Sequence, residues 1–503
     1  MSSQFHFVVC ISLVAAPIHG FVKSLENDYQ KTKENNPSKV EALHSPATFQ
    51  WNEKHAEIAT NGTKTGNWSS TRISIDSKNI KKGDLFVALK GRHFDGHDFL
   101  NEAFAKGAVA AIVSEPKNTN YPLVIVEDTL QALQHMASFC IKHILLDTKI
   151  IAVTGSVGKT TTKDMLHSTL SQFGVSHTNR GNFNNHIGLP LTILSAPRNC
   201  QYLVLEMGMS EKGEIQRLSD ISKPDIAVIT NIEHAHSANF HSLFDIARAK
   251  LEILYGIKPN GTIILNKDNQ YYDYLSSQSY KSGFNVMSFG KHQNTCTIQL
   301  LNTTRNGTGL NFKVKLPNNK ITNLYLKVFG EHFVYSALAT IAVLEALKLE
   351  LPQNVFEAFK IPNGRGNMHS IQYGDEHILL IDDSYNANPA SMKAAIKSLD
   401  MHSDGRKVAI LGDMLELGNE RVKFHTELYD CVTKTNVDKV HTVGELMLEL
   451  HNLLPEAKKG SHFNSSHQVV SNLSDIIQNN DIILVKGSRG MKMELIVKAI
   501  LSV

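Results

Sequence analysis

The sequence predicts an α/β protein whose main sheets are parallel and doubly wound, divided into about three domains. The chain has 503 residues, which is too many for a single hydrophobic core. From residue 148 onward, short apolar runs alternate with segments of helical periodicity, and this alternation is typical of parallel sheets covered by helices. One apolar run leads directly into a glycine-rich loop, and ligands bind at that end of a parallel strand.

The first residues of the chain differ from the rest. Residues 7–18 form an apolar run of the size of a signal-peptide core, and the polar residues 24–50 follow it like a linker. We therefore expect residues 1–47 to be a leader or a disordered appendage, with residues 1–20 as a possible targeting signal. The apolar run is too short to span a membrane, so we expect no stable membrane insertion.

Three blocks follow this leader. In the first block we expect a helix over 99–106 and strands over 72–75, 85–89, 110–113 and 123–126. In the second we expect a helix over 163–170, a β-rich stretch over 296–328, and buried strands over 150–153, 202–206, 226–230 and 262–265. In the third, a helix over 334–346 precedes strands over 378–381, 407–411, 439–443 and 482–485.

Composition argues against several classes of function. A net charge of +3 without a dense run of Lys or Arg gives no basis for nucleic-acid binding. The five cysteines are scattered and odd in number, so they predict neither a disulfide framework nor a zinc site. Free thiols favour a reducing compartment, and we expect the chain to act in the cytoplasm.

The glycine-rich loop predicts a phosphate-binding site. The strand over 150–153 runs into Gly155-Ser-Val-Gly158-Lys159-Thr160, followed by a helix. In such a loop the backbone N–H groups and the helix N-terminus bind phosphate, the lysine reaches the β- and γ-phosphates, and the hydroxyl of the last residue binds Mg²⁺. Val153 stands where the usual pattern has its first glycine, so an ordinary glycine-rich turn remains an alternative.

Two side chains at or just beyond predicted strand ends are candidate Mg²⁺ ligands. Glu206 closes the strand over 202–206, and His236 lies shortly after the strand over 226–230. A hard cation binds carboxylate and phosphate oxygens, and one imidazole can complete a second site. A lone residue of this kind is usually a solvated or capping side chain, but together with Lys159 and Thr160 at the same sheet edge the pair favours a metal site.

A polar loop at 182–190 is a candidate substrate site. It carries four amide or imidazole side chains in five positions, namely Asn182, Asn184, Asn185 and His186. Such side chains suit multidentate binding of a sugar or a peptide. Turn formation is the plain alternative, because amide side chains often only stabilise loops.

Several motifs together resemble the Mur ligases, which are ATP-dependent amide-bond-forming enzymes of peptidoglycan synthesis. The motifs are Thr154-Gly-Ser-Val-Gly-Lys-Thr-Thr161, the loop 182–190, Glu206-Met-Gly208 with Gly213-Glu-Ile215, and Thr230-Asn-Ile with Ala235-His236. Within the family, Asp382-Asp-Ser-Tyr-Asn-Ala-Asn-Pro-Ala-Ser-Met392 resembles the signature of members that add D-alanyl-D-alanine. The segments 411–418 and 485–491 are similar to the same members, and the resemblance runs from about residue 48 to the end.

The resemblance implies a three-domain Mur ligase architecture with a central phosphate-loop sheet and a C-terminal Rossmann-like domain. Residues 48–147 would bind the UDP substrate, 148–325 would bind ATP, and 326–503 would bind the incoming dipeptide. The implied reaction uses ATP and Mg²⁺ to join D-alanyl-D-alanine to a UDP-N-acetylmuramoyl tripeptide through an acyl phosphate. We expect a monomer.

The resemblance also assigns roles to individual residues. It implies Lys159, Lys250, Arg365 and His236 as catalytic residues and Thr160, Glu206 and His236 as metal ligands; Lys250 matches a lysine that related ligases carbamylate. The ATP contacts it implies are Thr154, Gly155, Ser156, Val157, Gly158, Lys159, Thr160, Thr161, Asn266, Asp268, Arg365 and Asp383. The substrate contacts it implies are Asp76, Ser77, Asn182, Asn184, Asn185, Tyr385, Asn386, Asn388, Lys486 and Ser488.

The chain departs from the family pattern at two positions. Ser336 stands where an Asn on the adenine side of the nucleotide is usual, and Lys78 stands where Arg is common and would bind phosphate less specifically. Three other functions therefore remain open. They are another ligase of the superfamily such as a folylpolyglutamate synthase, a phosphate-loop kinase or switch NTPase, and a nucleotide-sugar-binding remnant without activity.

Overall fold

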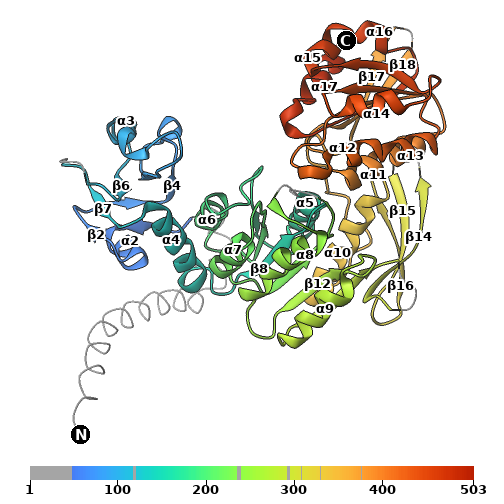
Figure 1. The fold of residues 1–503 in the computed structure, drawn as a ribbon. Coiled ribbons are helices and arrows are strands. Elements are labelled where there is room, and N and C mark those ends of the chain that lie inside the picture. Colours follow the sequence, from blue (N-terminus) through green and yellow to red (C-terminus); the bar gives the residue numbers. More distant parts are fainter. Residues whose placement is uncertain are drawn as a thin grey trace. The chain divides into compact units, whose positions relative to one another are not determined.

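The computed structural model describes residues 48–116, 120–234, 239–291, 295–306, 309–328, 330–374 and 376–502 (Figure 1). The expected leader, residues 1–47, and the expected metal ligand His236 lie outside these ranges. The described residues form two compact units. The first unit holds residues up to 150 with 174–205 and 217–224, and the second holds 151–173, 206–216 and the chain from 225 onward. Within the described ranges, no helix is both long and apolar enough to cross a membrane.

The first unit contains a five-stranded sheet in the order β2-β7-β6-β5-β4. Strands β4, β5, β6 and β7 are parallel, and β2 pairs antiparallel with β7. Their bounds are Thr63–Lys64 (β2), Arg72–Ser74 (β4), Asp84–Val87 (β5), Ala110–Val113 (β6) and Leu123–Ile125 (β7). Phe86, Leu100 and Val113 pack in a core between this sheet and α3 (Leu100–Ala105). The strands and the helix expected in this block are confirmed.

The remaining elements of the first unit are mostly helical. Helix α4 begins after Asp128, whose side chain accepts hydrogen bonds from the N–H groups of Leu130 and Gln131. Strand β10 runs parallel to β9. The bounds are Trp51–Asn52 (β1), Glu53–Thr60 (α2), Ser69–Ser70 (β3), Thr129–His143 (α4), Ser176–Thr178 (β9), Gly188–Leu194 (α6) and Tyr202–Glu206 (β10, whose last residue belongs to the second unit).

The second unit contains two sheets, of which the first carries the glycine-rich loop. Its strands follow the order β16-β15-β14-β13-β12-β11-β8, parallel from β8 to β14 and antiparallel beyond. The bounds are Lys149–Thr154 (β8), Ile226–Ile229 (β11), Thr262–Asn266 (β12), Asn285–Gly290 (β13), Ile298–Asn306 (β14), Gly309–Lys315 (β15) and Ile321–Leu326 (β16). The strands expected here and the β-rich stretch after them are confirmed.

Helices on this sheet position the loop. Helix α10 is apolar nearly all round, and it packs against α5, β12 and β13, as expected for a buried helix.

Helix α5 begins at Lys159, so the prediction that it starts at residue 163 was wrong. Gly158, with φ of 85°, ends the loop, and the helix follows at once although its first residues are polar. The bounds are Lys159–Leu170 (α5), Glu214–Ser222 (α7, of which residues 217–222 belong to the first unit), Leu243–Leu251 (α8), Tyr272–Lys281 (α9) and His332–Ala346 (α10).

The other sheet of the second unit is doubly wound, with strand order β17-β18-β22-β19-β20-β21. One face packs against α11 and the helices near α12, through Met392, Phe424 and Met447 among others. The opposite face packs against α15 and α17, through Val469 and Ile496. The strands are Asn367–Tyr373 (β17), Glu376–Asp383 (β18), Arg406–Gly412 (β19), Lys439–Val443 (β20), Lys459–Phe463 (β21) and Asp481–Lys486 (β22). The helices are Pro389–Asp400 (α11), Arg421–Thr426 (α12), Leu428–Thr433 (α13), Met447–Leu453 (α14), Ser466–Ser471 (α15), Leu473–Ile476 (α16) and Glu494–Leu501 (α17).

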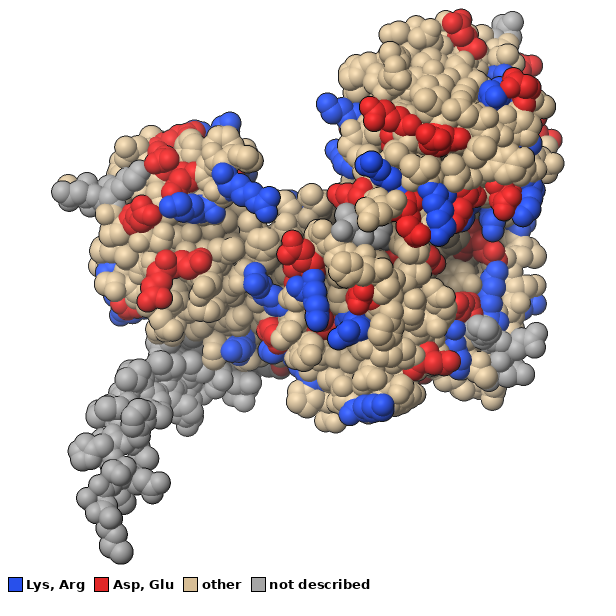
Figure 2. Space-filling view, in the orientation of Figure 1, with Lys and Arg blue, Asp and Glu red and all other residues tan. Residues whose placement is uncertain are grey.

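The surface carries both signs of charge. On the face drawn in Figure 2, Lys and Arg side chains are interspersed with Asp and Glu side chains. Such a mixed surface agrees with the small net charge of the sequence.

Candidate functional site

The glycine-rich loop packs closely against the end of a neighbouring strand, and this close approach requires a glycine. Gly155 has φ of 147°, and a Cβ there would lie 1.9 Å from the hydroxyl oxygen of Thr230. The Thr230 hydroxyl in turn donates a hydrogen bond to the carbonyl of Val157 at 2.5 Å. Because Thr230 follows β11 directly, this strand end holds the loop in place.

Two polar side chains of the loop are used by the protein itself. The Thr154 hydroxyl donates to the carbonyl of Met207 at 2.9 Å. The Ser156 hydroxyl donates to the carbonyl of Glu233 at 2.8 Å and accepts from the N–H of Glu233 at 3.0 Å. The side chains of Thr154 and Ser156, which were predicted to contact ATP, therefore stabilise the loop itself. The groups suited to binding an anion are the backbone N–H groups at the start of α5.

Lys159 places a positive charge over this loop. Its ammonium donates to the carbonyl of Gly155 at 2.7 Å and to that of Ser156 at 3.5 Å. Burial lowers the pKa of Lys159, while the Glu206 carboxylate raises it and the Arg365 guanidinium lowers it further. The charges of Glu206 and Arg365 thus both act on Lys159.

Lys250 is a buried lysine near the same place. It lies in the last turn of α8 and is only 3% exposed. Burial lowers its pKa well below the ordinary value, and the charge of Lys159 acts in the same direction. In the described part of the chain its ammonium has no ion-pair partner. This lowering favours the neutral amine over the ammonium, and the neutral amine is the form that reacts as a nucleophile.

Mg²⁺ would fit oxygen ligands at this sheet edge. Thr160 is the second residue of α5, and Glu206 ends β10 with 2% of its surface exposed. A hydroxyl and a carboxylate are hard donors of the kind that Mg²⁺ takes together with phosphate oxygens. The described residues contain no group of three His, Cys, Asp or Glu side chains placed to hold a metal ion.

The expected nucleotide motif after β12 is engaged in local contacts. The side chain of Asn266, 8% exposed, accepts from the N–H of Asp268 at 3.0 Å. The Asp268 carboxylate accepts from the Tyr335 hydroxyl at 2.7 Å and from the N–H of Lys291 at 2.8 Å. Asp268 therefore connects the end of β13 to α10.

Sequence reasoning missed the neighbouring Asn269. Its amide donates to the side-chain oxygen of Asn231 at 2.5 Å and to the carbonyl of Ile232 at 3.0 Å. The motif after β12 is thereby tied to the segment after β11. The sequence signal was present, since Asn231 and Asn269 both follow buried strands of one parallel sheet.

Ser336 supports the phosphate loop from α10. Its buried hydroxyl accepts a hydrogen bond from the Thr162 hydroxyl in the first turn of α5 at 3.0 Å. The position that departs from the family pattern is therefore joined to the loop helix.

The second group of predicted residues lies where β18 and β22 end. Arg365 is held because Tyr385 N–H donates to the carbonyl of Gly364 at 2.9 Å and Gly366 N–H donates to that of Asp382 at 2.7 Å. Gly364 has φ of 74°, a conformation that favours glycine. The Arg365 guanidinium lies over the Tyr385 ring, 4.3 Å from its centroid.

Lys486 and Asp383 form an ion pair in this group. The Lys486 ammonium lies 2.8 Å from the Asp383 carboxylate and donates to the carbonyl of Asn386 at 2.9 Å. Burial raises the pKa of Asp383, and the charges of Lys486 and Arg365 act in the opposite direction. Neighbouring parallel strands of one sheet carry the two residues, which explains why distant positions in the chain meet.

Ser488 and Asn388 make contacts within the protein. The Ser488 hydroxyl accepts from the N–H of Leu415 at 2.8 Å and donates to the carbonyl of Ala387 at 3.4 Å, so it joins the segments 382–392, 411–418 and 485–491. The Asn388 side chain caps α11 by accepting from the N–H of Ser391 at 2.8 Å. Asn386 is exposed, and its side chain faces the backbone of the 485–491 segment.

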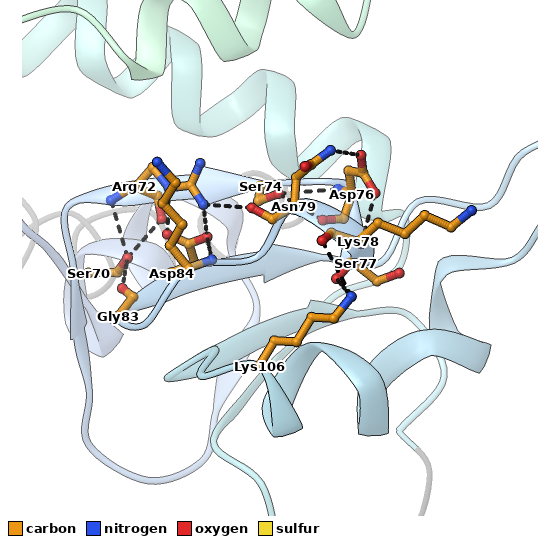
Figure 3. A network of polar contacts seen from close by, with 11 residues as sticks. Ser70, Arg72, Ser74, Asp76, Ser77, Lys78, Asn79, Gly83, Asp84 and Lys106 are labelled. Atoms are coloured by element: carbon orange, nitrogen blue, oxygen red, sulfur yellow. Dashed lines mark hydrogen bonds and ion pairs between the residues drawn. The ribbon is translucent and has the colours of Figure 1, made fainter.

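In the first unit, Asp76 and Ser77 belong to a polar network around β4 and the turn after it (Figure 3). The Asp76 carboxylate accepts from the N–H of Lys78 at 2.9 Å and from the Asn79 amide at 2.6 Å. The Ser77 hydroxyl donates to Glu102 at 3.1 Å. Figure 3 shows the Lys78 side chain extending away from the network, which leaves its ammonium directed outward.

The polar loop of the first unit leads into α6. Asn185 accepts at its side-chain oxygen from the N–H groups of Ile187 and Gly188, at 3.1 and 2.8 Å, and so closes the turn before the helix. Asn182 is exposed, and Asn184 is partly exposed. Asn182 thus offers its amide to solvent, while Asn185 accounts for the turn that sequence reasoning had kept as the alternative.

Three family models match this chain. They describe the Mur ligase middle domain over residues 153–344, the Mur ligase glutamate ligase domain over 365–489, and the Mur ligase family catalytic domain over 70–140. A UDP-N-acetylmuramoyl-tripeptide–D-alanyl-D-alanine ligase of Bacillus subtilis (strain 168) is 37% identical over 434 residues, which cover 85% of this chain and 92% of that protein.

Solved structures agree with this match. The crystal structure of MurF from Acinetobacter baumannii has 31% sequence identity and a TM-score of 0.83, covering 91% of this chain and 100% of that chain. The MurF ligase from Thermotoga maritima, in complex with ADP, has 27% identity and a TM-score of 0.75, covering 86% and 97%. The predicted α/β fold class and three-domain Mur ligase architecture are confirmed. The chain belongs to the Mur ligase family.

Proposed function

We propose that this protein joins D-alanyl-D-alanine to a UDP-N-acetylmuramoyl tripeptide at the expense of ATP, forming ADP and phosphate in peptidoglycan precursor synthesis. The observation that carries the proposal is that the charge of Arg365, beside the 382–392 signature, acts on Lys159 in the phosphate loop. A nucleotide site and a distinct amine-substrate site within electrostatic reach suit an ATP-driven ligase. Curated relatives of this chain carry the name of that ligase.

The reaction begins with a poor electrophile, because a carboxylate resists attack by an amine. The terminal carboxylate of the tripeptide attacks the γ-phosphorus of ATP, which gives an acyl phosphate and releases ADP. The free amine of D-alanyl-D-alanine then attacks the acyl carbon, the amide forms, and inorganic phosphate leaves. Lys159 and Arg365 carry the positive charge that stabilises the phosphoryl group in transfer, since such catalysis is mainly positioning and electrostatics.

Thr160 and Glu206 are the proposed Mg²⁺ ligands in the described part of the chain, and His236 is proposed from the sequence alone. When bound, Mg²⁺ would neutralise charge on the phosphate oxygens.

Lys250 is proposed to be carbamylated. Support comes from its burial and its lowered pKa, because the neutral amine combines with CO₂ to give an anionic carbamate and a proton. The new anion would lie near the cationic Lys159, so the modification replaces a repulsion by an attraction.

The three blocks keep their proposed roles. Residues 48–147 would bind the UDP substrate, 148–325 ATP, and 326–503 the dipeptide, and residues 1–20 would act, if at all, as a targeting leader. ATP and UDP-sugars are cytoplasmic metabolites, which supports the cytoplasm as the proposed compartment. We propose that Asp76, Asn182, Asn184, Asn185, Tyr385 and Asn386 contact the substrates, since each of these residues is at least partly exposed.

The test is the stoichiometry of phosphate release. Phosphate should appear only when ATP, a UDP-N-acetylmuramoyl tripeptide and D-alanyl-D-alanine are all present, with one amide formed per phosphate. A panel with lysine or meso-diaminopimelate as the third residue would define the acceptor. Phosphate release without the dipeptide would favour an NTPase, and binding of the UDP-sugar without any release would favour a remnant.

A further inference from the structure

One aromatic ring contacts two arginines from different loops. The Arg365 Cζ lies 4.3 Å from the centroid of the Tyr385 ring, and the Arg489 Cζ lies 5.5 Å from the same centroid. Both distances fall within the range of a cation–π interaction. Arg365 comes from the turn before β17, and Arg489 from the segment after β22.

Backbone contacts fix the ring in this position. Tyr385 N–H donates to the carbonyl of Gly364 at 2.9 Å, and a Cβ at Gly364 would lie 3.1 Å from the Tyr385 Cβ. A glycine thus permits the close approach of Tyr385 to the Arg365 loop. On the other side, the Asn386 side chain accepts from the N–H of Arg489 at 3.4 Å. The ring meets both arginines because one backbone hydrogen bond and one side-chain contact tie the three segments together.

The two guanidinium groups differ in their other electrostatic contacts. Arg489 is 63% exposed, and its contact with Glu494 is a loose one at 3.7 Å. Exposed ion pairs of this kind contribute little. Arg365 experiences the like charge of Lys159 and the opposite charge of Asp383. The face of one ring attracts both cations without neutralising either, so each charge stays available to an anionic ligand.

We propose that Tyr385 is a positioning residue that holds Arg365 toward the ATP phosphates and Arg489 toward the carboxylate of the incoming dipeptide, through the electrostatic attraction of its ring. This inference rests on the proposed function for the identity of the two ligands. It assigns Tyr385 a role through the arginines, beyond direct substrate contact. One residue thereby organises the binding of both small substrates.

The test lowers the electron density on the face of the ring while the shape of the side chain stays nearly constant. Tyr385→Phe serves as the reference, and the same position then carries 4-fluoro-, 3,5-difluoro- and 3,4,5-trifluorophenylalanine. Each fluorine weakens the attraction for a cation. We expect kcat/KM for ATP and for D-alanyl-D-alanine to fall stepwise, to about one fifth of the reference in the trifluoro protein, and Tyr385→Leu to fall about tenfold.

The matched control is Phe49 in the first unit, where the Arg198 Cζ lies 5.8 Å from the ring centroid. The same fluorinated residues at position 49 should leave both kcat/KM values unchanged. Equal kcat/KM values across the Tyr385 series would overturn the proposal, as would an equal fall in the Phe49 series. Thermal melting of each protein identifies a variant that fails to fold, and the remaining members of the series still decide.

A second readout separates this inference from the proposed function. The dissociation constant for ATP, measured by calorimetry without the other substrates, should rise along the Tyr385 series. If the unmodified protein forms no amide with any substrate pair, the proposed function is wrong. The ATP dissociation constants then still test whether the Tyr385 ring positions Arg365. A constant affinity for ATP along the series would refute the role of Tyr385 toward Arg365.

Discussion

The phosphate loop at 154–161 and the segment 382–392 both follow a strand that has parallel neighbours, yet they use their residues differently. In the loop, Thr154 and Ser156 bond to neighbouring backbone, which leaves backbone N–H groups and Lys159 for a ligand. In the segment, Asn388 caps a helix, while Tyr385 and Asp383 face cations from other parts of the chain.

This difference explains which site can be read from a sequence. A phosphate loop is local, because a strand, two glycines and a helix start define its shape within a few residues. The 382–392 site is assembled from segments that lie 100 or more residues apart, as Lys486 and Asn386 do. In such an assembled site, a polar residue can either stabilise the fold or bind the ligand. Only the contacts that it makes in the structure show which of these roles it has.

The largest expected effect tests the local site. Lys159→Ala should lower kcat about a hundredfold or more while the fold survives, because the ammonium is the charge of the loop that faces the transferred phosphoryl group. Steady-state ligation and thermal melting measure the two effects. The control is Lys258→Ala, which removes only an ion pair with Asp225 and should change kcat less than about threefold. Ligation by Lys159→Ala within about threefold of the original protein would refute the assignment.

The next prediction concerns Lys250, the buried lysine near the phosphate loop. Lys250→Ala should reduce ligation to about one hundredth, and added acetate or formate should restore part of it by supplying the lost anion. Incubation of the unchanged protein with ¹³C-bicarbonate should give a carbamate signal in the ¹³C NMR spectrum that Lys250→Ala lacks. Full activity of Lys250→Ala would show that the lysine is structural.

Most of the fold could be predicted, for physical reasons that the same two regions illustrate. Buried parallel strands are apolar on both faces, so β8, β11, β19 and β22 stood out as apolar runs. The start of α5 was misplaced because its first residues are polar, and the φ of Gly158 determines that start. Periodicity gives no information on such a backbone angle.

The roles of the individual site residues were harder to predict from the sequence than the fold. Asn388 precedes Pro389, a pair typical of a helix start, whereas nothing in the sequence shows that Asn386 is exposed. Nor does it indicate that Ser336 would bond to Thr162, or that Asp268 would receive the Tyr335 hydroxyl. These contacts depend on which strands become neighbours, and that is a property of the whole sheet.

A pH titration tests the unit that holds the assembled site. Burial lowers the pKa of His402 and of His441 to about 4, and nearby Lys and Arg charges act in the same direction. Since the unfolded chain protonates these residues near pH 6.5 and the folded chain does not, stability is full above pH 6.5 and falls as the pH drops toward 4. Each histidine contributes at most about 1.4 kcal/mol per pH unit in that window.

Urea unfolding at several pH values measures this slope. His441→Gln, which retains a side-chain acceptor for the N–H of Ser461, should flatten the loss of stability between pH 6.5 and 4. His467→Gln, in a surface helix, is the matched control and should leave the slope as it is. An unchanged slope in His441→Gln would mean that this residue is not held neutral in the folded state.

The smallest expected effect separates the two kinds of residue within the segment 382–392. Asn388→Ala removes the side chain that accepts from the N–H of Ser391, so the free energy of unfolding should fall by about 1 kcal/mol. Asn388→Asp keeps the cap and should restore most of that loss. Asn386→Ala is the counterpart, because its exposed side chain caps no helix; its stability should stay nearly constant while the KM for D-alanyl-D-alanine rises. If Asn388→Ala instead raised this KM several-fold without loss of stability, the cap would also bind the ligand, and the contrast between the two asparagines would fail.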